Sequence, residues 1–510
     1  MKEKNKIKNM HFFVLIFFLI LLFFLSVFKI NFFQDDYFFL KISRVNSIID
    51  FFKFYSPIRE YSYKPLATET FYFILHVFKE NIFIGKSIVF ITFFIGLIFF
   101  YKIVLNLTKK ELLARLTILI YGLSFIHVFQ LYWFATFQEV AVFCFLSISF
   151  YSFLKNKSIL SGLFFIFALF CKETAILYIL FLGLFVFVFD KNKLKKIAVH
   201  VVISFIFLLL YRYSLTFVTS LDNYKIVWNP KLLINNSVWY FLWGIGFPNF
   251  LPDYFRSIFS KPIVTFWEIL KIPYTKVYLS LLFIYLIFLF IGFLSYVIAR
   301  IRQLAETKQS HMRLPRPFGW RSHPFGWRSH PFGTRNDIML ILYLLANFFI
   351  FLGPILFFRH KWMIRLTMPF IFIAVIEALI IYYLLVNKNK WFNGLGVFLV
   401  IIYCIWNFFG VKVHEVSSTY LLENSIYLKT QAYFKKNKDE ILKYDVIYLK
   451  DITHNLPAGW NGSEKLINSF ANENFIDHFL PEKKIKVIFD FQNKKKPKNS
   501  YVINSNKLLP

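Results

Sequence analysis

The sequence predicts an α-helical, polytopic membrane protein with about eleven transmembrane helices and a small C-terminal domain. Of its 510 residues, 58% are hydrophobic and 17% are charged, whereas a soluble domain is nearer half apolar and a quarter charged. The apolar residues form blocks of roughly 17 or more, long enough to cross about 30 Å of hydrocarbon as helices. The net charge of +31 is spread among short loops, which indicates topology signals and contacts with membrane lipid rather than nucleic-acid binding.

The first span is predicted from the apolar run between Phe12 and Phe28, which follows four lysines and lacks a small-residue cleavage site typical of signal peptides. Positive residues favour the cytoplasmic side, so we expect a cytoplasmic N-terminus and an outward-facing loop over residues 31–81. Within this loop, "VNSIIDFFKFY" is predicted to lie in the membrane interface as an amphipathic helix.

Further spans are predicted at about 82–104, 114–131, 137–154, 159–170, 174–190, 197–217, 276–299, 338–357, 364–386 and 392–410. Segment 218–275 is not counted, because Gly244, Gly246, Pro248 and Pro252 indicate a broken, re-entrant or interfacial piece. Whether 233–250 spans the membrane is left open. The basic loop 301–336 is expected in the cytoplasm, and its "PFGWRSH" repeat at 317–330 is interpreted as an expansion in a tolerant loop.

Residues 1–410 are therefore assigned to a membrane domain and residues 411–510 to a C-terminal, extracytoplasmic domain. The latter reads as a helix ("STYLLENSIYLKTQAYFKKNKDEIL"), a strand ("YDVIYLKD"), a second helix ("SEKLINSFANENFIDHFL") and another strand ("KIKVIFDF"). This order predicts a small α/β or α+β fold. Its core is marginal at this length, so we expect it to dock on the membrane domain.

Acidic residues at the outer ends of the predicted spans are candidates for function, because ionisable groups near hydrocarbon are costly. They are Asp35, Asp36, Glu60, Glu69, Glu139 and Glu173. Adjacent side chains diverge by about 100° on a helix and about 180° on a strand. We therefore expect separate roles for Asp35 and Asp36, one as a general base for a hydroxyl and the other holding the loop or a second ligand.

Basic residues on the same side would complete an active site. The candidates are Arg59, Lys64, Lys172 and, in "FFRHKWMIR", Arg359, His360, Lys361 and Arg365. The last group opposes the positive-inside bias and suits a phosphate, so a lipid phosphate would place its head there and its tail between helices. His127 is a further candidate for lining the site. The spacing of Cys144, Cys171 and Cys404 does not indicate a disulfide framework or a zinc site. The sequence contains no nucleotide-binding or metalloprotease motif, so no cofactor or metal is implied.

Four features follow one another along the chain: the acid pair, "YKPL", "LSFIHVFQLYWFATFQEVAVF" and "LFCKETAILYILFL". Together they resemble the GT-C superfamily of integral-membrane glycosyltransferases, in particular the protein O-mannosyltransferase-like enzymes. The resemblance implies a donor sugar on a polyprenyl monophosphate, with Asp35 as catalytic base, Asp36 as its neighbour and Glu139 as the acid of the second outer loop. It also implies that Lys64, Lys172 and residues 359–365 contact the lipid phosphate or support the site.

The expected function is therefore transfer of a sugar from a polyprenyl-phosphate donor to a hydroxyl on protein, lipid or glycan, with inversion, at the outer face of a bacterial plasma membrane. Lys64 stands where the family has arginine, Val128 where proline often follows histidine, and the tail has no 34-residue repeat. The acceptor is left open for these reasons. Two alternatives remain: a transporter or flippase of lipid-linked sugars, and an inactive scaffold of this fold.

Overall fold

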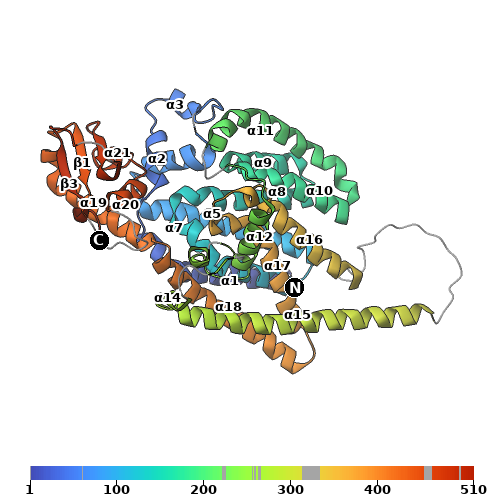
Figure 1. Ribbon diagram of the computed structural model, residues 1–510. Helices are drawn as coiled ribbons and strands as arrows, with labels where there is room; N and C mark the ends of the chain where they lie inside the picture. The colour runs from blue at the N-terminus through green and yellow to red at the C-terminus, as the bar shows by residue number, and fades with distance from the viewer. Residues whose placement is uncertain are drawn as a thin grey trace.

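In the computed structural model, a helical body carries a small sheet at one side (Figure 1). The structure describes residues 2–510 except 60, 221–224, 256, 258–259, 262–265, 313–333, 453–461 and 493–495. Glu60 and the "PFGWRSH" repeat lie outside the described residues.

The helices of the first half of the chain are α1 (Lys2–Phe23), η1 (Leu25–Lys29), α2 (Asp35–Ile42), α3 (Ile48–Lys53), η2 (Leu66–Thr70), α4 (Phe71–Val77), α5 (Ile82–Thr108), α6 (Glu111–Leu123), η3 (Phe125–His127), α7 (Val128–Tyr132), η4 (Phe134–Thr136), α8 (Phe137–Leu154), α9 (Ser158–Cys171), η5 (Glu173–Leu177), α10 (Tyr178–Phe189), η6 (Lys191–Lys193) and α11 (Leu194–Ser220). They are followed by α12 (Pro230–Gly244), α13 (Leu251–Tyr254), α14 (Phe266–Ile269), α15 (Thr275–Met312), α16 (Thr334–Leu352), η8 (Gly353–Phe357), η9 (Met363–Leu366), α17 (Thr367–Leu385) and α18 (Lys390–Ser417).

Seven of the described helical segments are long and apolar enough to cross a membrane: Ile82–Thr108, Phe134–Leu154, Lys191–Arg212, Thr275–Ala299, Leu340–Phe357, Met363–Leu385 and Lys390–Ser417. The polytopic helical class is thus confirmed, but the predicted number of eleven spans is not. The other four predicted segments are a pair bent by 44° (Glu111–Leu123 and Phe125–Tyr132) and three shorter apolar helices (Met10–Phe23, Ser158–Cys171 and Glu173–Phe189).

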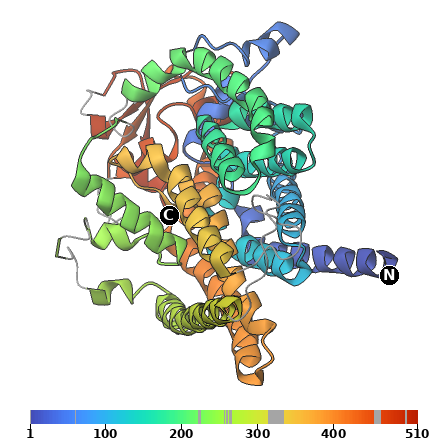
Figure 2. The ribbon, with the colours of Figure 1, turned by 90° about the vertical axis from the view of Figure 1, so that its right-hand side faces the viewer.

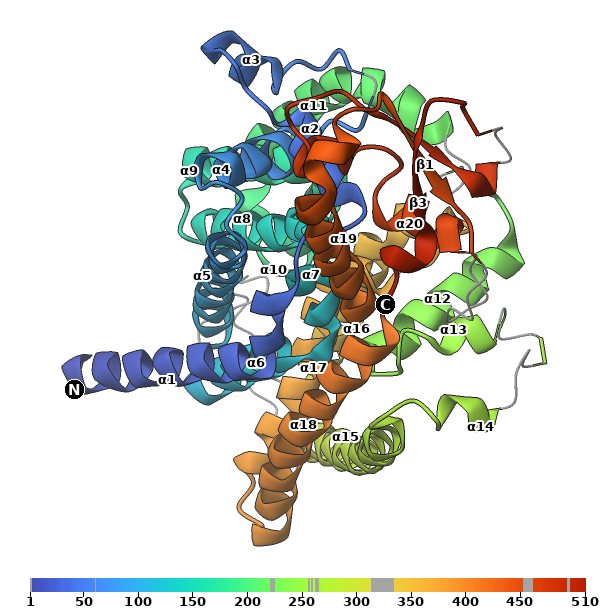
Figure 3. The same ribbon diagram turned by 90° about the vertical axis from the view of Figure 1, so that its left-hand side faces the viewer.

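A glycine allows two helices of the body to approach closely, and large apolar side chains are exposed on the outside. A Cβ on Gly96 of α5 would lie 2.5 Å from the Phe143 ring of α8, so these helices approach closely only because of the glycine. On the outside, α11 exposes Val201, Val202, Phe205, Ile206, Leu208 and Leu209, and α15 exposes Phe283, Ile287 and Phe290. Such surfaces are expected where a helix faces lipid. α1 projects sideways from the body, with the N-terminus at its tip (Figures 2 and 3).

Segment 218–275 is broken, as predicted, but part of it is a regular helix. α12 has 15 residues and is not among the seven candidate spans. The chain then turns at Gly246, whose φ of 103° and close approach to the Trp406 ring leave no room for a side chain. Asn236 of α12 donates to the carbonyls of Leu356 (2.8 Å) and Phe358 (2.9 Å), so this helix holds the chain just before the predicted basic cluster.

The C-terminal part contains α19 (Tyr420–Ile441), β1 (Val446–Lys450), α20 (Gly462–Ser469), α21 (Ile476–Phe479), β2 (Lys486–Phe489), η11 (Asp490–Gln492), β3 (Tyr501–Asn504) and η12 (Ser505–Lys507). The strands form a parallel sheet in the order β2-β1-β3. The predicted second helix is two helices, because the left-handed residues Ala471 and Asn472 separate α20 from α21. The third strand, β3, was not predicted.

These C-terminal elements contact the first loop of the membrane domain, as expected for a small domain with a marginal core. Figures 1 and 3 show them beside α2, with α19 continuing from the direction of α18. The Tyr37 ring packs against Phe470 and Phe479, and Lys41 forms an ion pair with Asp477 at 3.3 Å. The loop that carries the acid pair therefore lies between the helical body and the C-terminal domain.

Candidate functional site

The acid pair opens α2, where negative side chains favour the helix N-terminus. The two carboxylates lie in different surroundings: Asp36 is 0% exposed, whereas the Asp35 side chain is accessible to water. This difference agrees with the separate roles expected from their divergence on a helix.

Asp36 is a buried brace. Its carboxylate accepts hydrogen bonds from the backbone N–H groups of Phe33 (3.1 Å) and Ala135 (2.8 Å) and from the Tyr72 hydroxyl (2.5 Å). Lys86, also 0% exposed, interacts with it electrostatically and donates to the Tyr132 carbonyl at 2.6 Å. Burial raises the pKa of Asp36, and these donors and Lys86 act in the opposite direction. Asp36 thus ties α2, α4 and the turn at η4 together.

Asp35 has the properties of a general base. Protein surrounds it on most sides although water reaches it, and this burial raises the pKa of Asp35 above its usual value. The ammonium of Lys64 acts in the opposite direction and marks the nearest cationic partner. A carboxylate that is accessible and more basic than usual is suited to accept a proton from a hydroxyl.

Lys64 leads from Asp35 into a group of alternating charges. Its ammonium lies 3.7 Å from a carboxylate oxygen of Glu173. Lys172, the preceding residue, forms a buried ion pair with Glu139. Burial lowers the pKa of Lys172, and the neighbouring Glu139 acts in the opposite direction. Arg365 is buried and within electrostatic range of Glu173.

We call this set the charged cluster: Asp35, Lys64, Glu139, Lys172, Glu173 and Arg365. Its members come from helix ends, where polar side chains can gather without breaking a span. Glu139 is in the first turn of α8, Lys172 follows α9 in an extended conformation (φ −163°, ψ 135°), Glu173 begins η5, and Arg365 is in η9. Five segments far apart in sequence are therefore needed to build it.

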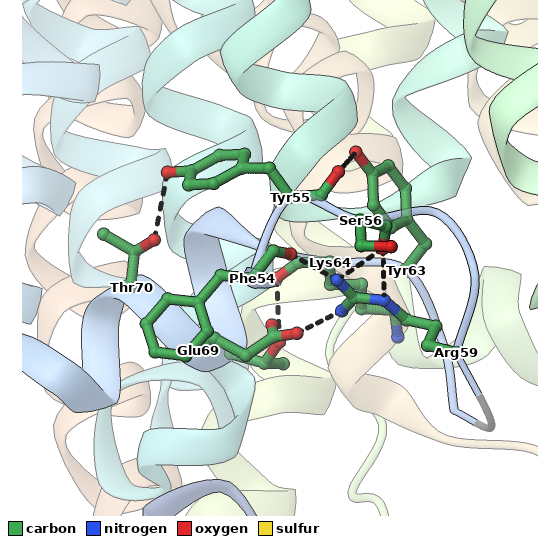
Figure 4. Close-up of polar contacts among 9 residues, drawn as sticks. Phe54, Tyr55, Ser56, Arg59, Tyr63, Lys64, Glu69 and Thr70 are labelled. Carbon is green, nitrogen blue, oxygen red and sulfur yellow. Dashed lines mark hydrogen bonds and ion pairs between the residues drawn. The ribbon is translucent and has the colours of Figure 1, made fainter. Parts of the chain in front are cut away.

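Arg59 is placed beside the cluster and does not face it. The guanidinium donates to the carbonyls of Ser56 (3.0 and 2.8 Å) and Phe54 and pairs with the buried Glu69 (Figure 4). The Tyr61 and Tyr63 rings lie 5.0 and 4.9 Å from it. Arg59 and Glu69 thus fix the loop around Lys64, whose carbonyl also accepts from the Thr68 hydroxyl at 2.8 Å at the start of the π-helical turn η2.

The remaining predicted residues are more distant or peripheral. The His127 ring packs against Phe93 and Tyr121 and bonds to the Tyr121 carbonyl at 2.7 Å, inside the helical body. Arg359 is exposed.

His360 and Lys361 lie at the edge of the cluster. Burial lowers the pKa of both, with Arg365 adding to the effect at His360 and Asp253 opposing it at Lys361.

Tyr240 of α12 is a member of the site that the sequence did not reveal. Its hydroxyl accepts from the backbone N–H of Trp362 at 3.2 Å and is within electrostatic range of Arg365 and Glu139. Tyr240 is 0% exposed, and through it α12 contributes a buried hydroxyl near Arg365 and Glu139. Its position in the ambiguous segment 218–275 left no sequence signal for this role.

A cavity of about 620 Å³ lies among α5, α8, α10, α16 and α17, within the range of about 300–1,000 Å³ typical of ligand pockets. Its lining is mostly aromatic and aliphatic and includes none of the charged cluster. Two of its lining residues are close in sequence to the cluster: Met368 is three residues after Arg365, and Tyr178 is five residues after Glu173. From Met368 to Leu379 it follows about 17 Å of α17, toward Lys109, Asp190 and Lys193 near the far ends of α5 and α10.

A search of protein-family models finds no match to this chain, and a search of curated proteins finds no matching relative. In the part of the chain that the structure describes, no three His, Cys, Asp or Glu residues are grouped closely enough to hold a metal ion.

Proposed function

We propose that this membrane protein transfers a sugar from a polyprenyl-phosphate donor to a hydroxyl acceptor. The observation that carries the proposal is the arrangement of three parts: an accessible carboxylate, a group of cations beside it, and a long apolar cavity below them. Each part matches one requirement of a lipid-linked sugar donor.

The cations suit the phosphate and the cavity suits the lipid. Lys64, Lys172 and Arg365 are held close together by Glu139 and Glu173, and a phosphate entering the cluster would take over part of that pairing. The cavity has the apolar lining expected for a hydrocarbon chain. A lipid phosphate with its head in the cluster and its chain in the cavity would satisfy both.

The proposed reaction needs one base and no strong acid. The acceptor oxygen attacks the anomeric carbon, its proton passes to the Asp35 carboxylate, and the bond from that carbon to the phosphate oxygen breaks. The polyprenyl phosphate leaves with both bonding electrons, and the adjacent cations stabilise the charge that it gains. Attack opposite the leaving group inverts the anomeric centre.

The charged cluster and the C-terminal domain belong on the outer side of the membrane in this proposal. The four lysines before the first apolar run favour a cytoplasmic N-terminus, which places residues 31–81 outside. The short helix α3 in this loop exposes Ile48, Ile49 and Phe52. An interfacial position would cover these side chains with lipid.

The test is transfer by the purified full-length protein in sealed proteoliposomes, given a radiolabelled sugar on a polyprenyl monophosphate and a set of hydroxyl acceptors. Mass spectrometry of glycans from cells with and without the protein would select these acceptors. Asp35→Asn should lower turnover at least about 100-fold while expression and donor binding persist. Asp50→Asn, in the same loop but on α3, is the matched control and should keep full activity.

Undiminished turnover of Asp35→Asn would refute the role of Asp35. Movement of the donor between leaflets without any transfer would instead identify a flippase. Binding of the donor with neither transfer nor movement would indicate an inactive scaffold.

A further inference from the structure

The residue before the acid pair has an unusual backbone. Gln34 has φ 51° and ψ −128°, a combination that residues with a side chain rarely adopt. It precedes the first turn of α2 and makes no side-chain cap to that helix. Strained residues persist only where surrounding contacts hold them, so contacts with other parts of the protein must keep Gln34 in this conformation.

Those contacts come from the C-terminal domain. The Gln34 backbone N–H donates to the Ser469 carbonyl at 2.7 Å, and its side-chain amide donates to Glu423 at 3.3 Å. Glu423 is in turn paired with Lys465 at 2.5 Å, and both side chains are at least nine-tenths buried. Gln34 is therefore bound by α19 and α20, which lie more than 380 residues later in the sequence.

The chain on both sides of Gln34 is fixed by the membrane domain. The Phe33 carbonyl accepts from the Trp133 indole at 3.2 Å, and the two rings stack at 5.6 Å. On the other side, Asp36 is bound by Ala135 and Tyr72. Phe33 and Asp36 are therefore both fixed, and the backbone dihedral angles of Gln34 between them determine the direction of the Asp35 side chain.

We propose that the C-terminal domain positions Asp35 by holding Gln34 in its left-handed conformation. Gln34 and Glu423 are then positioning residues: they touch no substrate but direct the Asp35 carboxylate toward Lys64. The catalytic meaning of this device rests on the proposed function, whereas the positioning itself does not. Without the hydrogen bond to Glu423, Gln34 is expected to relax toward negative φ, which would reorient the first residues of α2.

Two substitutions of Gln34 separate the effect of its backbone conformation from the effect of its hydrogen bond to Glu423. Gln34→Ala and Gln34→Gly both lose the bond to Glu423 and both keep the backbone N–H. Alanine is strained at this φ, whereas glycine adopts it freely. The Asp35 carboxylate should change its direction in Gln34→Ala and remain in place in Gln34→Gly. A third variant, Glu423→Met with Lys465→Met, removes the acceptor and its counter-ion together, so that no buried charge is left unpaired.

The first readout does not depend on activity. A water-soluble carbodiimide with an amine labels accessible carboxyl groups, and peptide mass spectrometry gives the rate at Asp35 in the full-length protein. We expect the labelling rate of Asp35 to change at least threefold in Gln34→Ala and in the double variant, and to stay within twofold of wild type in Gln34→Gly. Asp445, 81% exposed, serves as the internal control and should label equally in all four proteins.

The second readout is turnover. Gln34→Ala should lower kcat about tenfold with little change in KM for the donor, and Gln34→Gly should restore it. Equal labelling of Asp35 in all four proteins, or an equal change in the alanine and glycine variants, would overturn the proposal. If labelling follows expectation but wild type transfers no sugar, the positioning of Asp35 is supported and only the proposed function fails.

Discussion

Replacing each member of the acid pair by asparagine should give two different defects. Asp36→Asn keeps the size of a fully buried side chain but replaces one accepting oxygen by a donating amide group. Asp35→Asn makes the same chemical change at a position that water already reaches. The pair is therefore a matched comparison of a structural and a chemical carboxylate.

The loss at Asp36 can be worked out from its partners. One of its oxygens accepts from Phe33 and the other from Ala135 and Tyr72. In either orientation the new amide group faces at least one buried donor, which costs about 1–3 kcal/mol. Lys86 also loses a nearby negative charge. Removing one partner of a buried ion pair costs about 3–5 kcal/mol, and only part of this applies because the Lys86 ammonium keeps its bond to the Tyr132 carbonyl. We expect Asp36→Asn to lower the free energy of unfolding by about 3 kcal/mol.

For Asp35→Asn the expected change in stability is within about 0.5 kcal/mol, as for an exposed substitution without a structural partner. Tryptophan fluorescence of both variants and wild type in the same detergent, heated at the same rate, compares their resistance to unfolding. Asp36→Asn should unfold at a clearly lower temperature, and Asp35→Asn should match wild type while losing transfer. An Asp36→Asn protein as stable as wild type would contradict the role of Asp36 as a brace.

Three further substitutions test the surroundings of the pair. Arg365→Ala should weaken donor binding at least about tenfold, because a charge-assisted hydrogen bond contributes about 1.5–3 kcal/mol, whereas the exposed Arg359→Ala should change it less than about twofold; equal affinities in a titration would remove Arg365 from the phosphate site. Lys64 opposes the rise in the pKa of Asp35, so Lys64→Met should move the acidic limb of the pH–kcat profile to higher pH, and an unmoved limb would argue against their coupling. Burial raises the pKa of Glu80, but hydrogen bonds from two histidines, one of them in the C-terminal domain, outweigh it and hold the pKa far below 4.5. This stabilisation is fully present above pH 4.5 and declines as pH falls toward the folded-state pKa, so Glu80→Gln should lower the unfolding midpoint more at about pH 6 than at about pH 3, and an equal effect at both would argue against these bonds.

The sequence predicted the helical class and the place of the acid pair because both depend on local patterns. Long apolar runs indicate spans wherever they pack, and helix geometry alone separates the directions of Asp35 and Asp36. The number of eleven spans is not confirmed, because four of the predicted runs form short or bent helices. Hydropathy measures composition, whereas the length and straightness of a helix depend on breaks such as those at Ser124 and Lys172.

The sequence named every member of the charged cluster as a candidate, but it did not separate them from charged residues that lie outside it. Lys64, Lys172 and Glu173 lie in charged loops of an apolar chain, so composition marked them. Arg59 looked equally suitable, but its donors are used within its own loop. Sequence shows that a charge is present and does not show which partner satisfies it. Tyr240 carries no charge and therefore gave no signal.

The assignment of roles within the acid pair depends on contacts that no local pattern contains. Asp36 is a brace because the Ala135 N–H, 99 residues away, reaches its carboxylate. Asp35 follows Gln34, which is bound by the C-terminal domain, and its nearest cationic partner is Lys64. If this assignment is correct, weakening the contacts of Asp36 also affects the chemistry at Asp35: Ala135→Pro, which deletes one donor to Asp36, should destabilise the loop and reduce transfer together. Loss of stability with full transfer in that variant would show that the position of Asp35 does not depend on the brace.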